Sequence, residues 1–205
     1  MVRQMPVVPD EVRAVPAPPL PTYPEPYSAR FADPDGDAEM LSEWMNRPHL
    51  VETWGYNYPA DEWRRHLEVQ FEGAFSRPHI VSLNGRPIVY VEYYRAAQDY
   101  IATLYDAHPH DLGFHAAIAD PALLDQGVAQ VLLPSGVKSV FKAEPECRRV
   151  VGDTAVDPST PGNQVARRLG GVFLGQHYVP AIDRHLVLFT WPRTPDDIPA
   201  YRQDS

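Results

Sequence analysis

Two side chains with acid or base chemistry stand within apolar runs of the chain. His115 interrupts the run FHAAI, and Asp153 ends the run CRRVVGD. Histidine titrates near neutral pH and aspartate is a ready proton acceptor, so the pair could transfer protons if the two runs are neighbouring strands that end at one cleft. Structural alternatives exist, because a lone histidine in a strand is more often a hydrogen-bonded core residue and a lone aspartate more often caps a turn.

A segment suited to an anion follows the histidine run. In QGVAQ, residues 126–130, Gly127 stands where a helix is expected to begin, and the unpaired N–H groups of a first helical turn attract phosphate. Ala116 and Ala117 are small enough for an extended amide ligand, such as a pantetheine arm, to approach the strand where a neighbouring strand diverges. The alternatives are that Gly127 only eases a tight turn and that the alanines pack under a helix.

Metal and thiol chemistry fit the chain less well. His108, His110, Asp111 and His115 lie within eight residues, but their spacing matches no closed zinc pattern and no cysteine lies near them. Cys147 begins a predicted buried strand and has no base paired with it, which argues against a nucleophile. We therefore expect no metal site.

The spacing of hydrophobic residues predicts two amphipathic helices before the first expected strands. Residues 37–50 and 61–75 carry apolar side chains at helical spacing, and Pro48 is placed to end the first helix. The expected buried face of the second comprises Trp63, Leu67, Phe71 and Phe75.

A hairpin and further elements complete the expected domain. Two β-rich runs flank Asn84 and Gly85, a pair that suits a type I′ turn, and Pro87 indicates an edge or a bulge beside it. Further strands are expected over 111–120, 147–153, 172–180 and 183–192, and further helices over 122–134 and 163–171.

This order of elements predicts an α/β (α+β) domain with a mixed sheet. The chain has no Gly-x-Gly-x-x-Gly fingerprint and no phosphate-loop motif. Its 205 residues suit one folding unit. We expect a proline-rich arm over 1–26, which holds eight of the 23 prolines, a domain over 27–192 and a tail over 193–205.

The charge balance excludes some partners. A net charge of −9 opposes attraction to nucleic acid and to anionic lipid. No apolar run has the length of a membrane helix or a signal peptide, so we expect a cytoplasmic protein with no integral membrane association and no nucleic-acid partner. One local group of basic residues could still bind an anion or an acidic protein: Lys138, Lys142, Arg148, Arg149, Arg167 and Arg168.

Three segments carry a family likeness. AEMLSEWMNRPHL, LGFHAAIAD and EPECRRVV resemble the corresponding stretches of the GNAT-superfamily siderophore acyltransferases, above all those that acylate the N6 position of lysine in mycobactin-type siderophores. The likeness runs from about residue 27 to 191. It implies a GNAT fold, with a mixed central sheet, splayed strands that hold the pantetheine of an acyl thioester, and helices on both faces.

The resemblance also implies roles for particular residues. The catalytic aspartate of the family falls on Asp153. The inserted segment TAVDPSTPG leaves Asp157 as an alternative. Asp153 is preferred because it follows the matching segment CRRVV without a gap. The substrate-contacting histidine falls on His115. The donor-binding residues fall on Ala116, Ala117, Ile118, Gln126, Gly127, Val128, Ala129 and Asn163.

The implied reaction moves an acyl group, long-chain in the mycobactin-type enzymes, from an acyl carrier protein or CoA thioester to the amine or hydroxylamine of lysine. The acyl-CoA or acyl-phosphopantetheine is a co-substrate, and no cofactor is permanently bound. Two alternatives stay open: an acetyl-CoA-dependent N6-hydroxylysine acetyltransferase of the aerobactin type, and a catalytically silent GNAT-like module that binds pantetheine or a partner.

Overall fold

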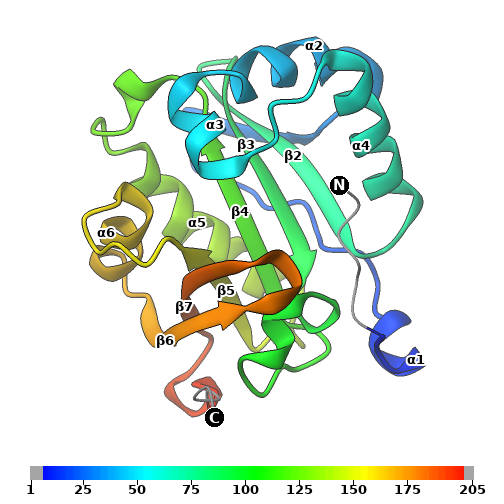
Figure 1. The fold of residues 1–205 in the computed structure, drawn as a ribbon, viewed down its shortest axis with the longest axis vertical. Coiled ribbons are helices and arrows are strands. Elements are labelled where there is room, and N and C mark those ends of the chain that lie inside the picture. The colour runs from blue at the N-terminus through cyan, green and yellow to red at the C-terminus, as the bar shows by residue number, and fades with distance from the viewer. Residues whose placement is uncertain (1–6, 201–205) are drawn as a thin grey trace.

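A computed structural model describes residues 7–200 of the chain, and its centre is a seven-stranded sheet in the order β1-β2-β3-β4-β5-β7-β6 (Figure 1). The strands are β1 (Tyr27–Phe31), β2 (Ser76–Leu83), β3 (Arg86–Arg95), β4 (Leu112–Ile118), β5 (Arg149–Thr154), β6 (Val172–Val179) and β7 (Arg184–Pro192). Every neighbouring pair is antiparallel except β4 and β5, which are parallel. The sheet is therefore mixed, as the sequence predicts.

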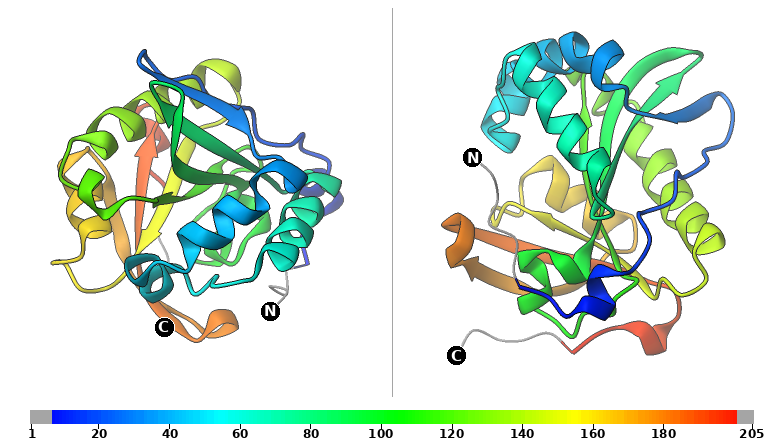
Figure 2. Two further views of the ribbon diagram at one scale, coloured as in Figure 1. Left: turned by 90° about the horizontal axis from the view of Figure 1, so that it is seen from above. Right: turned by 90° about the vertical axis from the view of Figure 1, so that its right-hand side faces the viewer.

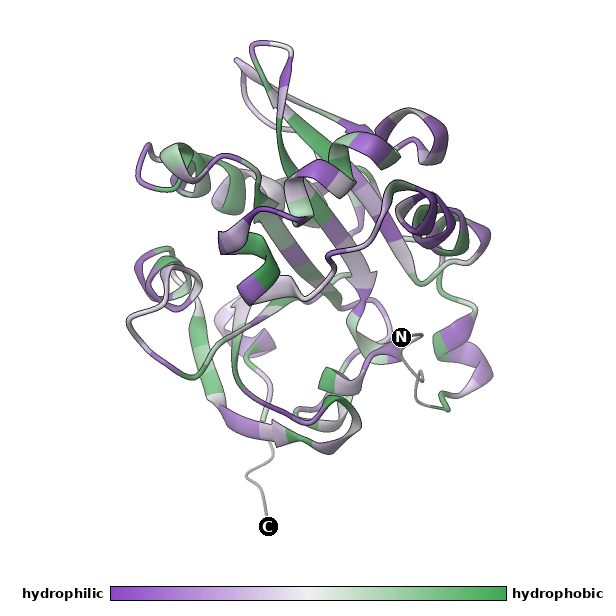
Figure 3. Ribbon diagram, turned by 45° about the horizontal axis from the view of Figure 1, so that its top comes forward, coloured by the Kyte–Doolittle hydropathy of each residue, from purple (hydrophilic) through white to green (hydrophobic). Residues whose placement is uncertain are grey.

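Helices cover both faces of this sheet. They are α1 (Asp10–Arg13), α2 (Pro34–Met45), α3 (Pro48–Trp54), α4 (Ala60–Glu72), α5 (Val128–Ala143) and α6 (Pro161–Arg168), and short 3₁₀ turns span 96–98, 100–103, 121–123, 180–182 and 195–197. Figure 2 shows α2 and α4 on one side of the strands and α5 on the other. Hydrophobic residues concentrate in the central strands, and hydrophilic residues are frequent in the surrounding helices and loops (Figure 3).

The cores on the two faces follow from the alternation of side chains along the strands. On the face covered by α5, Val89, Val91 and Tyr93 of β3 pack with Val137 and Val140 of the helix. On the other face, Tyr90 and Ala117 pack with residues of α2 and α4, which include Leu41, Trp44, Trp63 and Leu67. From Tyr90 onward, the even-numbered side chains of β3 thus share the second face with the odd-numbered side chains of β4.

The hairpin is confirmed in its turn and in its irregularity. Asn84 and Gly85 both have positive φ, 51° and 78°, as a type I′ turn requires. The register shifts between Val81 and Ser82, because Ser82 pairs with Pro87 while Val81 pairs with Val89. The expectation of an edge or a bulge beside Pro87 is therefore confirmed by the bulge.

Three boundaries differ from the sequence-based expectation. Pro48 does follow the end of α2, but it also opens a separate helix, α3, whose first turn does not need the missing N–H. Phe75 lies beyond α4, which ends at Glu72. In the helical stretch expected over 122–134, the helix begins only at Val128, after Gly127, where its first turn is expected, and it continues through Pro134 to Ala143, because the apolar side chains after Pro134 pack on the sheet.

The N-terminal arm lies along the domain from residue 7 onward (Figure 2). Val15 is buried, Arg95 donates from Nε to the Pro16 carbonyl at 2.7 Å, and Thr22 bonds the Ser139 hydroxyl of α5 from its backbone N–H at 2.7 Å. Extended, proline-rich backbone has no internal hydrogen bonds, so its polar groups bond to the body of the protein instead. The arm is therefore packed against the domain, and its Val15 side chain is part of the buried interior.

Candidate active site

A gap opens in the sheet between β4 and β5. Among the described residues, only Leu112 and Gly113 of β4 pair with β5, opposite Val150 and Val151. Beyond them β4 follows β3 as far as Ile118, while β5 follows β7 as far as Thr154. The two strands thus splay apart, and the sequence-based expectation that the histidine strand diverges from its neighbour is confirmed.

His115 and Asp153 meet at the base of this gap. Each lies two residues beyond the last paired residue of its strand, and the Nε2 atom of His115 is 3.3 Å from Oδ1 of Asp153. The two side chains are 20% and 22% exposed. They are close enough to share a proton and open enough to meet a ligand.

A buried carboxylate lies behind the histidine. Glu92 of β3 is directly opposite His115 in the strand register, and its Oε2 atom is 3.6 Å from Nδ1 of His115. Burial acts to raise the pKa of Glu92, but the His115 and His66 rings outweigh it and hold that pKa well below its usual range. Glu92 is therefore ionised at neutral pH.

Aromatic rings enclose the histidine on the face opposite α5. The Tyr94 ring stacks on the His115 ring at a centroid distance of 4.9 Å, and the Trp54 ring meets it edge-on at 5.8 Å. The Trp54 ring also lies beside the ring of Tyr56, in the loop after α3, at a centroid distance of 5.8 Å. These rings form an apolar wall beside the polar pair.

Two of the expected donor-binding segments lie on β4 and at the start of α5. Gly127 precedes the first residue of α5 and has a φ of +77°, so the turn there needs glycine and the helix starts at Val128, with Ala129 in its first turn. Ala116 is exposed. An open strand edge can bind the amides of a thioester donor, and a helix N-terminus can bind its phosphate groups.

Three other expected donor contacts already have partners within the chain. The Ile118 carbonyl lies 3.1 Å from Nε2 of His49, and Ala117 is buried against the α2 and α4 core. Gln126 donates its backbone N–H to the Leu123 carbonyl at 3.2 Å. For Ala117, the alternative that the alanines of this strand pack under a helix is therefore correct.

Asn163 of α6 is fully buried. Its Nδ2 donates to the Ala155 carbonyl at 3.2 Å, and its Oδ1 accepts from Nε of Arg167 at 2.7 Å. Its amide therefore fastens α6 to the end of β5, the strand that carries Asp153. Its role in donor binding stays a prediction.

The two candidate aspartates differ sharply in position. Asp157 lies in the loop before α6, where it accepts a hydrogen bond from the Ser159 N–H at 2.8 Å. Bonding to Ser159 lowers the pKa of Asp157. It thus caps a turn, while Asp153 contacts His115.

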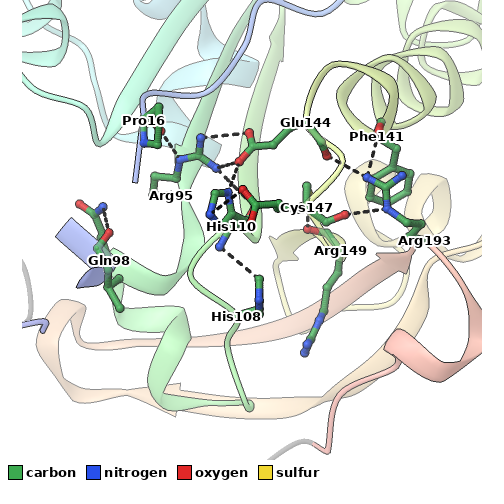
Figure 4. A network of polar contacts seen from close by, with 12 residues as sticks. Pro16, Arg95, Gln98, His108, His110, Phe141, Glu144, Cys147, Arg149 and Arg193 are labelled. Carbon is green, nitrogen blue, oxygen red and sulfur yellow. Dashed lines mark hydrogen bonds and ion pairs between the residues drawn. The ribbon is translucent and has the colours of Figure 1, made fainter. Parts of the chain in front are cut away.

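His108 and His110, the two histidines shortly before β4, belong to a separate network of polar contacts (Figure 4). His110 contacts Glu144 at 2.7 Å, and Arg149 pairs with buried Asp111 at 3.3 Å. Cys147 is buried, and burial raises the pKa of its thiol to about 12. Within residues 7–200, no group of three or more His, Cys, Asp or Glu side chains is placed to hold a metal ion.

The basic group is only partly available to a partner. Arg149 is buried, while the other members are exposed: Lys138, Lys142, Arg148, Arg167 and Arg168.

The sequence reasoning missed Glu92, Tyr94 and Trp54. A signal for the first was present, since IVYVEYYR sets a single acidic residue in a strand of apolar and aromatic residues, and a carboxylate in such a strand is rarely buried without a partner. Trp54 gave no signal, because its place beside His115 depends on the separate helix α3.

The fold and this site define a class. Residues 33–189 match the family described as Acetyltransferase (GNAT) domain, and the chain belongs to this family. The family match and the similarity to lysine N-acyltransferases identify it as an N-acyltransferase.

Particular relatives are closer in sequence. The chain is 53% identical, over 96% of its length and 80% of the relative, to Lysine N-acyltransferase MbtK of Mycobacterium sp. (strain MCS). It is 29% identical, over 69% of its length and 44% of the relative, to N(6)-hydroxylysine O-acetyltransferase of Escherichia coli. A crystal structure of aminoglycoside acetyltransferase AAC(6')-Ib in complex with coenzyme A shares the fold, with a TM-score of 0.69, 24% identity, and coverage of 82% of this chain and 95% of that one.

No helix among the described residues has the length and apolarity to cross a membrane.

Proposed function

We propose that this chain transfers an acyl group from a CoA or acyl-carrier-protein thioester to the N6 amine, or hydroxylamine, of lysine or a lysine-bearing precursor. We further propose that the acyl group is long and that the reaction serves a mycobactin-type siderophore in the cytoplasm. The observation that carries the proposal is the contact of His115 with Asp153 at 3.3 Å, at the base of the gap between β4 and β5. The identity of 53% to a lysine N-acyltransferase supports the choice of acceptor.

The donor lies in the gap in this proposal. The open edge of β4 near Ala116 offers backbone groups to the amides of pantetheine, and the first turn of α5, from Gly127 to Ala129, receives the phosphates. The thioester carbonyl then lies close to His115 and Asp153, on the side of the aromatic wall.

The acceptor amine must lose a proton before it can attack, since a free lysine amine has a pKa of about 10.4. Asp153 accepts that proton, directly or through water, and His115 orients the amine. A C–N bond forms as the C–S bond breaks, and the sulfur leaves as a thiolate that takes up a proton. Backbone N–H groups from Ala116 to Ile118 stabilise the oxyanion.

An acidic carrier protein would dock near the exposed basic residues. Lys138 and Lys142 lie on α5, and Arg167 and Arg168 end α6, the helices that border the proposed donor site. Because the whole chain carries a net charge of −9, these residues would provide local attraction for an acidic partner.

Product analysis by mass spectrometry tests the proposal. Purified protein is offered lysine, N6-hydroxylysine and an assembled siderophore precursor, each with acetyl-CoA, long-chain acyl-CoA and long-chain acyl carrier protein. We expect N6-acylated products with the long-chain donors. Product from acetyl-CoA and hydroxylysine alone would favour the aerobactin-type alternative, and no product from any pair would favour a silent module.

A further inference from the structure

We propose that Glu92 is a positioning residue for His115, which its buried carboxylate holds with the Nδ1 atom protonated and the Nε2 atom directed at Asp153. The kinetic part of this inference rests on the proposed function. The structural part rests on the contacts of three side chains on one face of the sheet.

The strand register places the three groups in line. Glu92 and His115 are direct partners on antiparallel β3 and β4, so their side chains leave the same face side by side. One ring nitrogen of His115 is 3.6 Å from Glu92 and the other is 3.3 Å from Asp153. The imidazole thus lies between two carboxylates.

The two oxygens of Glu92 have different partners. Its Oε1 atom accepts from the Tyr90 hydroxyl at 2.7 Å and from Nε2 of Gln70 at 3.1 Å, and lies 3.3 Å from Nε2 of His66. Its Oε2 atom contacts Nδ1 of His115. The oxygen that faces His115 is therefore held in place by bonds to the other oxygen.

A further contact fixes the direction of the Gln70 amide. The Ser76 hydroxyl donates to Oε1 of Gln70 at 2.7 Å, which leaves the amide nitrogen to face Glu92. The carboxylate is thus set by donors from α4 and β3, and its 7% exposure excludes most solvent.

An ionised carboxylate beside Nδ1 has a chemical consequence for the other nitrogen. It favours a proton on both ring nitrogens, so that Nε2 can donate to the Asp153 carboxylate. Within residues 7–200, His115 faces the titratable groups Glu92 and Tyr94 of β3 and Asp153 of β5, and α3 contributes the uncharged Trp54. Glu92 is thus a second carboxylate beside the ring, distinct from the expected base, Asp153.

The test is NMR titration of the His115 ring nitrogens in the full chain, with kinetics beside it. In Glu92→Gln, which keeps the size and removes the charge, we expect the His115 midpoint to fall by about one pH unit or more. We also expect kcat to fall at least tenfold with a smaller change in KM, because the ring no longer holds its orientation toward Asp153. A His115→Gln variant assigns the signals.

Glu144→Gln is the matched control. Glu144 is also a well-buried carboxylate in contact with a histidine and is held by a further donor, Arg95, but it lies in the separate network of Figure 4. We expect it to change stability and to leave the His115 midpoint and kcat unchanged.

An unchanged His115 midpoint in Glu92→Gln would overturn the inference whether or not the protein acylates lysine, so this readout separates it from the proposed function. Should Glu92→Gln fail to fold, Glu92→Asp is used instead, because its side chain is one methylene shorter and its carboxylate lies farther from Nδ1 of His115. An unchanged midpoint in a folded Glu92→Asp protein with intact kcat would overturn the inference equally.

Discussion

The Tyr94 ring lies directly over the backbone of Gly113. The two residues are partners in the register of β3 and β4, and a Cβ atom at Gly113 would lie 2.2 Å from Cζ of the Tyr94 ring. An aromatic ring that covers a cross-strand glycine is a recognised device for fixing register. Here the same ring stacks on His115, so the absence of a side chain at Gly113 sets the ring that borders the site.

Gly113→Ala is therefore expected to displace Tyr94 and to disturb the site. We expect a loss of about 1–3 kcal/mol in the free energy of unfolding, from overpacking, and a fall in kcat of up to about 10²-fold from the misplaced histidine. Urea denaturation and steady-state kinetics measure the two effects. Gly73→Ala is the control, because the nearest atom to its Cβ is 3.9 Å away, and equal effects in both variants would contradict this account.

Asp153→Asn is expected to abolish most turnover while donor affinity is retained. The amide cannot accept the amine proton, and loss of a positioned general base typically costs about 10²–10⁴-fold in rate. Kinetics and a binding assay with a non-reactive thioester analogue measure the two properties. Asp157→Asn provides the comparison, since that side chain only caps a turn, and a larger loss of turnover in Asp157→Asn than in Asp153→Asn would reverse the assignment.

Much of the fold could be predicted from local patterns, while the surroundings of His115 could not. The Asn84-Gly85 turn and the strands that carry His115 and Asp153 follow from turn chemistry and the alternation of apolar residues. The contact of Glu92 with His115 depends on which strands are neighbours and on their register, information that no single segment contains. Pro134 misled the prediction of α5, because tertiary packing of the residues after it outweighs the lost hydrogen bond.

The buried His79 is expected to make stability depend on pH. Burial lowers the pKa of His79 to about 3, whereas an unfolded histidine titrates near 6.5. The unfolded chain therefore takes up a proton as pH falls below about 6.5, and the stability present above that pH is lost progressively towards pH 3. The slope is about 1.4 kcal/mol per pH unit for this one group.

His79→Gln isolates that contribution. Glutamine keeps a nitrogen near the Tyr23 hydroxyl, which lies 3.3 Å from Nε2 of His79, and does not titrate. Between pH 6.5 and 4 we expect the natural chain to lose about 3 kcal/mol more than the variant in the free energy of unfolding. Denaturation in urea at each pH measures it, with the exposed His185→Gln as control, and parallel pH curves for the natural chain and His79→Gln would contradict the expectation.

Arg95 is expected to be the side chain that holds the N-terminal arm to the domain. It is 1% exposed, its guanidinium bonds both oxygens of Glu144 at 2.6 and 3.0 Å, and its Nε donates to the Pro16 carbonyl. Arg95→Ala leaves a buried carboxylate without its cation, a change that costs about 3–5 kcal/mol, and releases the arm to proteases. Arg65→Ala breaks an exposed pair with Asp61 and should cost less than about 1 kcal/mol. Urea denaturation and limited proteolysis measure the difference, and an arm that stays resistant in Arg95→Ala would show that the Thr22 contact to α5 holds it instead.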